Sequence, residues 1–405
     1  MKPTLLLSAA ILTTTLCATN SCSSQEPKPE VKGPAIWNID NINLKASRIA
    51  AGEKIDFYEA LKADADSILL VDVNPSVMFK PHAPISGDKH DYMSLSRYWW
   101  PNPDTESGLP YVRHDGRSNP ELKAYDRSQL SKFSESINTL SLVYYISGEQ
   151  KYADKAISRL RTWFIDPETR MNPNLAYAQI RKGHNDDKGS HSGLLDGFSF
   201  VTMLDAVSLL EIKETLPKGV QDSMQMWFAD LSEWMLTSEN GIAESNANNN
   251  HAVAYDTQVI RYAMYGGRDS VARAVINAFP ERRMATQIEE DGRMPAELAR
   301  TIAFFYTRYN IEHMIDICEM ASKLGIELYP ANQYAIERAI EWMLPHSTDP
   351  DNFPYEQINS WQSVQQSFAR LLYRASKYGN EERYKAYYNE HKAEQENPLF
   401  EFLYL

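Results

Sequence analysis

From about residue 121 onward, apolar residues recur at helical spacing, and this pattern restricts the fold more than any other feature of the chain. Leu130, Phe133, Ile137, Leu140 and Tyr144 follow one another at intervals of three or four residues. Alternating or β-branched runs joined by hairpin turns, which are the signals of strands, are nearly absent. The chain is therefore predicted to be all-α. Similar patterns predict further helices at 41–70, 152–164, 192–213, 218–237, 249–265, 268–289, 296–323, 331–344, 358–378 and 381–391.

The connections between these segments predict how the helices pack. Helices that follow one another through short turns pack as antiparallel hairpins. A long series of such hairpins without solenoid-type sequence repeats favours a closed or nearly closed ring of helix pairs over a simple bundle. No Gly/Ser-rich linker divides the body, so residues 41–405 are predicted to form a single domain.

Two long irregular segments interrupt the helical pattern. Residues 71–120 are rich in proline and glycine, and residues 166–191 form a second stretch of this kind. Loops of such length inside a compact domain are usually functional. The first loop carries Trp99 and Trp100 in tandem, and aromatic rings displayed in clefts commonly hold sugars by stacking. We therefore expect the two loops to line a cleft.

The charge balance narrows the class of partner. The 405 residues carry a formal net charge of −13, which argues against nucleic acid or an anionic membrane surface as the main partner. A polyanionic ligand remains compatible with this charge, because a local cluster of arginine and lysine in a cleft can override the global sign.

The N-terminus is predicted to be a targeting segment. An apolar run from Leu5 to Leu16 has the length of a signal-peptide core and is too short to span a bilayer. Residues 1–22 are therefore predicted to be a signal peptide, and residues 23–40 a tether. Cys22 resembles a loose lipoprotein cleavage site, so the alternatives are a periplasmic protein and an outer-membrane lipoprotein. Only Cys318 lies in the body, so no intrachain disulfide is expected there.

The first polar stretch with chemical potential lies at Ser245–Gln258. Asparagine caps helices and tolerates left-handed backbone geometry, so its four asparagines predict a loop that turns into a helix. Asn248, His251 and Tyr255 then share one helical face with Gln258, which suits the wall of a polar cleft. The alternative is a capped helix with a buried, hydrogen-bonded histidine.

A second polar face follows Asp291–Pro295. Ala299, Ala303, Tyr306, Asn310 and His313 lie on one side of the predicted helix, with Arg300 one residue round. Two small residues followed by Tyr, Asn and His indicate a face with open space beside polar groups. The alternative is an ordinary helix–helix contact.

Together the two stretches supply the side chains that β-elimination on a uronic acid polymer requires. Removing the proton next to a carboxylate adds charge to a group that is already negative, so Asn, Arg or protonated groups must neutralise it. A His or Tyr must take the proton, and a Tyr must protonate the departing glycosidic oxygen. This reaction requires neither a metal nor a cofactor, and no His-x-x-x-His spacing is present.

Several blocks of the sequence resemble the alginate lyase superfamily of polysaccharide lyases, whose fold is an (α/α) toroid. They are Asp91–Pro103, Gly108–Arg113, Asn119-Pro-Glu, Met171–Gln179, Asn-Asn-His251 and Glu-Leu-Ala-Arg300. The resemblance implies that His251 and Tyr306 are the base and acid, and that Asn250 and Arg300 neutralise the carboxylate. In the alginate lyases that the chain resembles, the tyrosine follows the arginine by seven positions, whereas in this chain Tyr306 follows Arg300 by six. Sugar subsites are expected to include Gln179, Arg97, Tyr98, Trp99, Asn174, His191 and Tyr255.

The resemblance makes alginate the first expected substrate and glucuronan the second. Which of His251 and Tyr306 takes the proton stays open, as does the oligomeric state. His184 and His191 flank a polar loop that is either solvated or part of the cleft, where His191 could act on the carboxylate or as a base for the other C5 epimer. Two rival functions are a non-catalytic glycan-binding lipoprotein and a glycoside hydrolase with two opposed carboxylates, for which Glu289–Asp291 is the candidate set.

Overall fold

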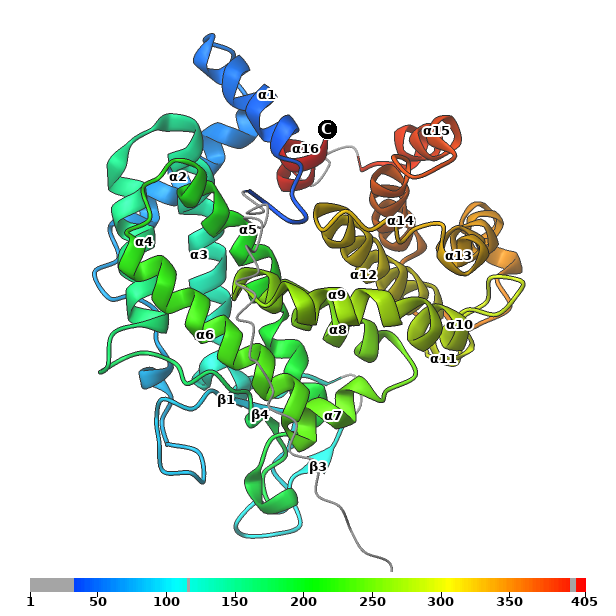
Figure 1. Cartoon of the computed structure of the whole chain (residues 1–405). Helices are drawn as coiled ribbons and strands as arrows, with labels where there is room; N and C mark the ends of the chain where they lie inside the picture. The colour runs from blue at the N-terminus through cyan, green and yellow to red at the C-terminus, as the bar shows by residue number, and fades with distance from the viewer. Residues whose placement is uncertain (1–32, 115–116, 394–397) are drawn as a thin grey trace, which may run out of the picture. The chain divides into compact units, whose positions relative to one another are not determined.

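The computed structural model describes residues 33–114, 117–393 and 398–405 (Figure 1). Lys32–Leu405 form one compact unit. The predicted signal peptide, Cys22 and most of the predicted tether lie outside the described residues. The last part of the tether prediction is wrong, because Ala35, Ile36 and Trp37 are buried. Their backbone N–H groups donate to the carboxylate of Asp205 at 2.8, 2.9 and 2.8 Å, which fastens this segment to the helical body.

Helix pairs make up the body. Five helices, here called the inner helices, pack one against the next along the chain: α3 (Asp126–Ser147), α5 (Ser199–Ile212), α8 (Asn250–Tyr265), α12 (Ala303–Lys323) and α14 (Trp361–Ala375). Each is followed by a second helix of its pair: α4 (Gln150–Phe164), α6 (Lys218–Thr237), α9 (Asp269–Phe279), α13 (Ala331–Thr348) and α15 (Glu381–His391). This succession of hairpins is the arrangement that the helical spacing predicts.

The sequence of each helix explains its place in a pair. Nearly every residue of α8 is buried, as expected for a helix that packs on several sides. In α9 the buried residues Ala272, Ile276 and Phe279 lie on one stripe, as in a helix with a solvated face. The helix predicted at 268–289 is confirmed over 269–287, where α9 continues without a break through a π-helical turn (Pro280–Met284) into a short α10 (Ala285–Gln287).

The two ends of the described chain meet. The helix predicted at 41–70 is in fact two, α1 (Ile39–Ala50) and α2 (Asp56–Leu69), because Gly52 takes a left-handed φ of 91° in the turn between them. A C-terminal helix that the pattern did not predict, α16 (Pro398–Tyr404), packs against both (Figure 1). The last helix therefore lies beside the first.

Short strands order the long loops. β1 (Met93–Leu95) pairs in parallel with β4 (Tyr177–Ile180), and β2 (Trp99–Trp100) pairs antiparallel with β3 (Val112–Arg113). β4 packs against η4 (His191–Phe198), which in turn packs against α7 (Glu239–Ser245), a helix that the pattern also missed. Figure 1 labels these strands and α7. The remaining short helices are Val77–Phe79, Pro120–Ala124, Asn185–Asp187, α11 (Pro295–Leu298) and Pro350–Asn352.

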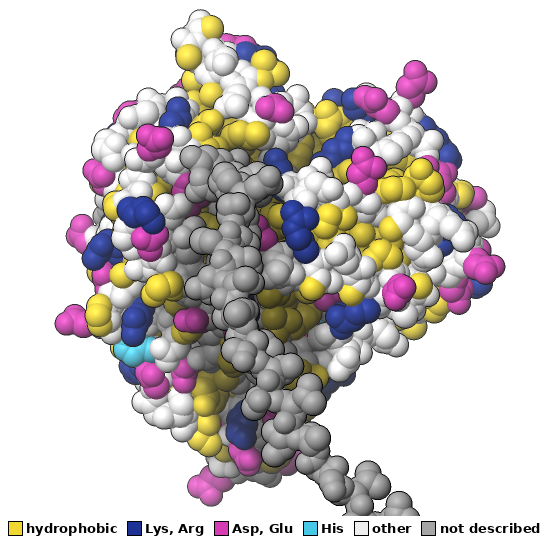
Figure 2. All heavy atoms as spheres, viewed as in Figure 1, with side chains coloured by type: hydrophobic (Ala, Val, Ile, Leu, Met, Phe, Trp, Pro, Cys, Tyr) yellow, Lys and Arg dark blue, Asp and Glu magenta, His cyan; other side chains and the backbone are white. Residues whose placement is uncertain are grey.

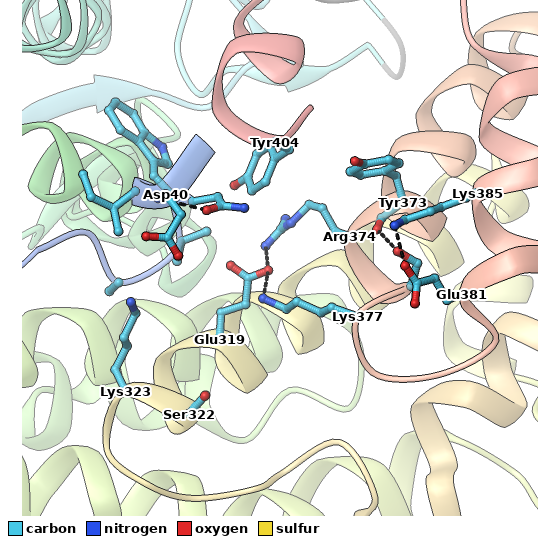
Figure 3. A pocket seen from close by; sticks show the side chains of 16 residues that line it. Asp40, Glu319, Ser322, Lys323, Tyr373, Arg374, Lys377, Glu381, Lys385 and Tyr404 are labelled. Carbon is cyan, nitrogen blue, oxygen red and sulfur yellow. Dashed lines mark hydrogen bonds and ion pairs between the residues drawn. The ribbon is translucent and has the colours of Figure 1, made fainter. Parts of the chain in front are cut away.

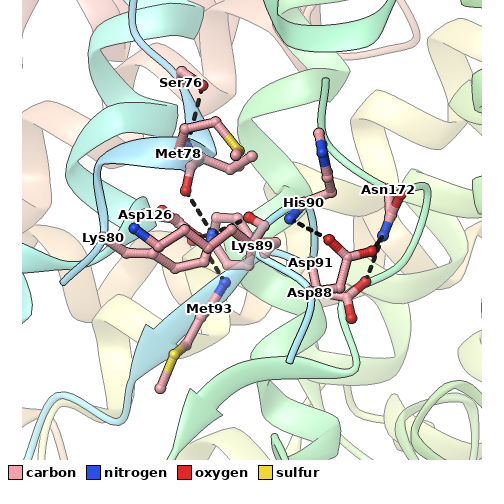
Figure 4. Close-up of polar contacts among 12 residues, drawn as sticks. Ser76, Met78, Lys80, Asp88, Lys89, His90, Asp91, Met93, Asp126 and Asn172 are labelled. Atoms are coloured by element: carbon pink, nitrogen blue, oxygen red, sulfur yellow. Dashed lines mark hydrogen bonds and ion pairs between the residues drawn. The ribbon is translucent and has the colours of Figure 1, made fainter. Parts of the chain in front are cut away.

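A buried ion pair fastens the first loop to inner helix α3 (Figure 4). The ammonium of Lys80 lies 2.9 Å from the carboxylate of Asp126, and neither side chain is exposed. Lys80 also donates to the backbone carbonyls of Val77 and Lys89 at 2.5 and 2.6 Å, while Asp126 accepts the N–H of Met93 at 2.8 Å. Burial raises the pKa of Asp126 to about 6, although Lys80 opposes this shift. The start of β1 is thus held at the first turn of α3.

The surface carries mixed charges. Figure 2 shows acidic and basic side chains interspersed over the face in view. In the described part of the chain, one helical stretch, 185–212, is long and apolar enough to cross a membrane, but 78% of its most apolar window is buried within the protein. The same composition is found in a core helix, and this stretch contains inner helix α5.

Candidate active site

The two polar stretches meet at one buried carboxylate. Glu297, in α11, accepts the backbone N–H of Asn250 at 2.5 Å and its side-chain amide at 2.8 Å. It also accepts the amide of Asn310, from α12, at 3.2 Å. Burial raises the pKa of Glu297, and the neighbouring charges of Arg300 and His251 oppose the shift. The first turn of α8, the short helix α11 and Asn310 of α12 are therefore joined in one network.

The cap of α8 sets the direction of His251. Asn249 is the N-cap residue, and its side-chain oxygen accepts the N–H of His251 at 3.1 Å. The asparagine-rich stretch is thus a loop that turns into a helix, as predicted. His251 lies in the first turn with its side chain 24% exposed, so the ring can be reached from solvent.

Glu244 holds two histidines at once. This residue is the last but one of α7 and is fully buried. One carboxylate oxygen lies 2.6 Å from Nδ1 of His251, and the other lies 2.6 Å from Nδ1 of His191 in η4. A carboxylate only accepts hydrogen bonds, so each imidazole presents an Nδ1–H to Glu244. In the neutral form of each ring, Nε2 then carries the free lone pair.

Arg300 and Tyr306 lie together, although not on the helical face that the sequence predicts. The helix predicted at 296–323 is broken between Leu298 and Ala303, and the N–H of Ala303 donates to the carbonyl of Glu356 at 2.9 Å. Within the break, Arg300 folds back so that its guanidinium carbon lies 3.8 Å from the centroid of the Tyr306 ring. Tyr306 is half-buried in the first turn of α12.

Gln179, in β4, forms a hydrogen bond that joins the two long loops. Its backbone φ of 55° is left-handed, and its N–H donates to the hydroxyl of Ser94 at 2.8 Å. Its side-chain amide donates to the buried carboxylate of Asp196 at 3.0 Å. Gln179 is half-buried and borders a pocket of about 250 Å³.

This pocket lies beside the histidine pair. Besides Gln179 it is lined by Arg181, His184, Asn185, Lys188, Gly189, Ser190, His191 and Asn240. The ring of Trp99 packs edge-on against His184 at 4.9 Å, and the guanidinium of Arg181 lies 5.0 Å from the centroid of a Trp99 ring. His184 also contacts the backbone oxygen of Tyr111 at 2.7 Å. The sequence left two positions for the loop between His184 and His191, one solvated and one in the cleft. Both histidines border this pocket.

Other predicted sugar contacts have mixed outcomes. Arg97 is exposed and Tyr98 is half-buried next to β2, and nothing tests their roles, which stay predictions. Asn174 is half-buried, and its amide donates to Asp91 at 3.0 Å while its oxygen accepts the N–H of Ala176 at 3.1 Å. Asn174 therefore stabilises its own loop. Asn250 is 1% exposed, so its contact with a substrate carboxylate also stays a prediction.

The prediction that Tyr255 faces the cleft is wrong. Tyr255 is 3% exposed, and its hydroxyl donates to the carbonyl of Met235 at 2.8 Å. Gln258 is fully buried, and so is Asn310, while His313 is 3% exposed beside Asp316. Inner helices pack on all sides, so their polar faces reach the site only in the first turns.

Sequence reasoning missed two carboxylates that organise the site. Glu244 precedes His251 by seven residues across a corner between helices, and no helical face joins them. Glu297 gave a weak signal as the acidic residue after Pro295, but its partner Asn250 is 47 residues away in the chain. Both carboxylates are buried, so each must be paired or hydrogen-bonded, and only the fold identifies the partners.

A larger pocket lies elsewhere. It has a volume of about 550 Å³ and is bordered by Ala35–Asp40 and by α12, α14, α15 and α16 (Figure 3). Three of its charged groups are joined, since Glu319 binds Arg374 at 3.2 Å and Lys377 at 3.0 Å. Across the described ranges, no three His, Cys, Asp or Glu side chains are grouped to hold a metal ion.

Comparisons with known proteins agree on one family. The family model described as alginate lyase matches residues 76–353. A crystal structure of an alginate lyase from Bacteroides ovatus is 39% identical, with a TM-score of 0.86 over 92% of this chain and 99% of that one. Alginate lyase from Pseudomonas syringae pv. syringae is 22% identical over 67% of this chain and 71% of its own length. The match to the Pseudomonas entomophila enzyme, at 26% identity, covers 33% of this chain and only 35% of that protein.

A more distant structure shares the fold. Alginate lyase A1-III, in a histidine-to-alanine variant complexed with a tetrasaccharide, matches with a TM-score of 0.61 at 15% identity. The match covers 93% of this chain and 97% of that one.

Proposed function

Because the chain belongs to the alginate lyase family of polysaccharide lyases, we propose that it cleaves alginate by β-elimination at the site formed by His251, Tyr306 and Arg300. The family resemblance and the (α/α) toroid predicted from the sequence are both confirmed. The residue roles below are the proposal.

The reaction must remove a weakly acidic proton. In the proposed step, Nε2 of His251 takes the proton from C5 of the uronate, and the C–H electron pair moves toward the carboxylate as an enolate. The pair then forms the C4=C5 double bond while the bond from C4 to the glycosidic oxygen breaks. Tyr306 gives its hydroxyl proton to that oxygen. A new reducing end and an unsaturated uronate result, and no water is consumed.

Electrostatic support comes from Arg300 and Glu244. Arg300, which lies against the Tyr306 ring, is the proposed partner of the substrate carboxylate and of the enolate. Glu244 accepts from Nδ1 of His251, so the free lone pair is on Nε2, and the carboxylate stabilises the imidazolium that forms. Asn250 is proposed to assist at the carboxylate through the amide hydrogen that Glu297 does not use.

One observation carries the proposal. Glu297 joins Asn250, the neighbour of His251, to the segment that bears Arg300 and Tyr306. Because Asn250 and Glu297 are 47 residues apart in the chain, this contact supports the proposal that His251, Arg300 and Tyr306 act at one site. The tetrasaccharide complex of the A1-III variant supports an oligosaccharide as the class of ligand.

Activity on defined polymers tests the proposal. Purified protein is incubated with mannuronate-rich alginate, guluronate-rich alginate and glucuronan, and the absorbance of unsaturated uronate is followed. We expect His251→Ala and Tyr306→Phe to lower kcat by about 100- to 10,000-fold without unfolding the protein. His391→Gln, on the distant helix α15, serves as the matched control and should retain activity.

Three outcomes distinguish the alternatives. Activity on glucuronan alone would replace the substrate but keep the mechanism. Tight binding of alginate without turnover, unchanged in His251→Ala, would favour a glycan-binding protein. Full activity of both variants would remove His251 and Tyr306 from the reaction.

Export is a separate proposal. The apolar run at Leu5–Leu16 and the cysteine at position 22 support export to the periplasm or attachment to the outer membrane through a lipid on Cys22. Expression in a Gram-negative host with labelled fatty acid tests it. Label that disappears in Cys22→Ser supports the anchor, and unlabelled protein retained in the cytoplasm contradicts export.

A further inference from the structure

The carboxylate of Glu244 links two imidazoles that the chain supplies from different elements. Nδ1 of His191 and Nδ1 of His251 each lie 2.6 Å from one of its oxygens. The two rings are therefore separated by a single carboxyl group. The Glu244 side chain has no exposed surface, whereas the side chain of His191 is 51% exposed and that of His251 is 24% exposed. Both rings thus face outward from a common buried anchor.

His191 also borders the 250 Å³ pocket, whose other lining groups suit an acidic sugar. Arg181 and Lys188 supply positive charge there, and Asn185, Ser190 and Asn240 supply hydrogen-bonding groups. A carboxylate is well matched to such a set, because charge-assisted hydrogen bonds from arginine, lysine and imidazolium are the strong ones. The lining of the pocket therefore suits the carboxylate of one uronate residue.

We propose that Glu244 is a positioning residue that divides the work between two imidazoles: His191 binds the carboxylate of the neighbouring uronate, and His251 is left as the neutral base. This inference rests on the proposed function of the same site. One carboxylate charge supports one imidazolium well and a second one poorly, since two adjacent cations repel each other. A uronate in the pocket adds a second negative charge on the side of His191, so the proton is held there.

The charged groups around the pair come from several elements. They are Glu297 and Arg300 from the α11–α12 segment, Arg282 bonded to Ser245 beside Glu244, and Arg181, His184 and Lys188 from the pocket. The test therefore uses changes between variants of the pair, with the surroundings kept constant.

Replacing His191 and replacing Glu244 should shift the titration midpoint of His251 in opposite directions. In His191→Gln, Glu244 serves His251 alone and the repelling imidazolium is gone, so the midpoint of His251 rises. In Glu244→Gln, the neutral amide offers one oxygen and one NH₂ group, so it cannot accept from both Nδ1–H groups and cannot stabilise an imidazolium. The midpoint of His251 then falls, and one ring is left in the wrong tautomer.

Two measurements on the full-length protein test this. Histidine labelled with carbon-13 in the ring gives the titration midpoints by NMR without any substrate, for wild type, His191→Gln, Glu244→Gln and the control His391→Gln. Steady-state kinetics on alginate then give the pH dependence of kcat/KM. We expect His191→Gln to raise KM about 5- to 10-fold with little change in kcat, as for one partly exposed charge-assisted hydrogen bond. Glu244→Gln should lower kcat by about 100-fold.

The results separate the inference from the proposed function. A higher His251 midpoint in His191→Gln and a lower one in Glu244→Gln support the link, and they do so even if no uronan is cleaved, in which case only the proposed function fails. If the His251 midpoint does not move in these two variants, or moves in the same direction in both, the inference is overturned while the enzyme stays active. If Glu244→Gln does not fold, His191→Gln decides alone: an unchanged midpoint or an unchanged KM overturns the inference.

Discussion

Replacing Lys80 by methionine should destabilise the protein strongly, because the change leaves a carboxylate buried without its cation. The Lys80 and Asp126 side chains are both fully buried, and their charged groups are 2.9 Å apart. Methionine preserves most of the volume of lysine but removes three polar contacts, to Asp126 and to the carbonyls of Val77 and Lys89. Breaking a buried pair in this way costs about 3–5 kcal/mol of unfolding free energy.

The same figure sets the expected change in melting temperature. An unfolding entropy of about 2.1 cal/mol/K per residue, applied to the 405-residue chain, converts this loss into a decrease of about 4–6 °C. Urea unfolding followed by circular dichroism gives the free energy, and a thermal scan gives the temperature. Lys218→Met, at a side chain 80% exposed in a surface pair, is the control and should stay within about 0.5 kcal/mol of wild type.

The pH dependence provides a second check. Burial already raises the pKa of Asp126 to about 6 from 3.8, and without Lys80 it rises further. A carboxyl whose folded-state pKa is raised stabilises the fold below its unfolded pKa, and this contribution is lost as pH rises through the folded pKa. The deficit of Lys80→Met should therefore be large at neutral pH and shrink in acid. The expected loss of unfolding free energy in Lys80→Met at pH 7 is about 3–5 kcal/mol. A measured loss below about 1 kcal/mol at this pH would refute the reasoning.

Three further predictions concern other parts of the structure. Asp205→Asn should lower the unfolding free energy by about 3–5 kcal/mol in urea titrations, because Asp205 pairs with buried Arg261 at 2.9 Å and binds the segment at 35–37. The folded-state pKa of Glu297 lies above its usual 4.5, so the contribution of this group to stability is lost as pH rises through the folded-state pKa. The unfolding free energy of wild type relative to Glu297→Gln should therefore fall as pH rises through that range. A difference that does not depend on pH would contradict this. Trp99→Ala should raise KM on alginate about 2- to 10-fold with a smaller change in kcat, as expected if the ring stacks on a sugar, and an unchanged KM would remove Trp99 from the subsite.

Periodicity predicted the helices because burial of one face is a local property of the sequence. It failed where a contact with a distant segment decides the backbone. The pattern continues through 299–302, yet the helix breaks there because Ile302 forms a β-bridge with Gln357. The run at 41–70 is broken by the left-handed turn at Gly52, whereas the pattern counted only apolar spacing.

The sequence predicted the residue types of the candidate site better than the hydrogen bonds that join them. His251, Arg300 and Tyr306 were selected from the sequence, and the structure places their two segments in one network through Glu297. The pattern could not identify Glu244, because its partner His191 comes from a loop 53 residues earlier in the chain. The polar stripe of α8 misled at Tyr255, since polar side chains on an inner helix can be satisfied within the core.

The mass balance of the products tests the account most directly. A mannuronate oligomer of defined length is digested to completion with the purified protein, and the products are weighed by mass spectrometry. We predict pairs of products whose masses sum to that of the substrate, with the unsaturated end on one member, and loss of these products in Tyr306→Phe. Pairs whose masses exceed the substrate by one water would show hydrolysis and would contradict β-elimination at this site.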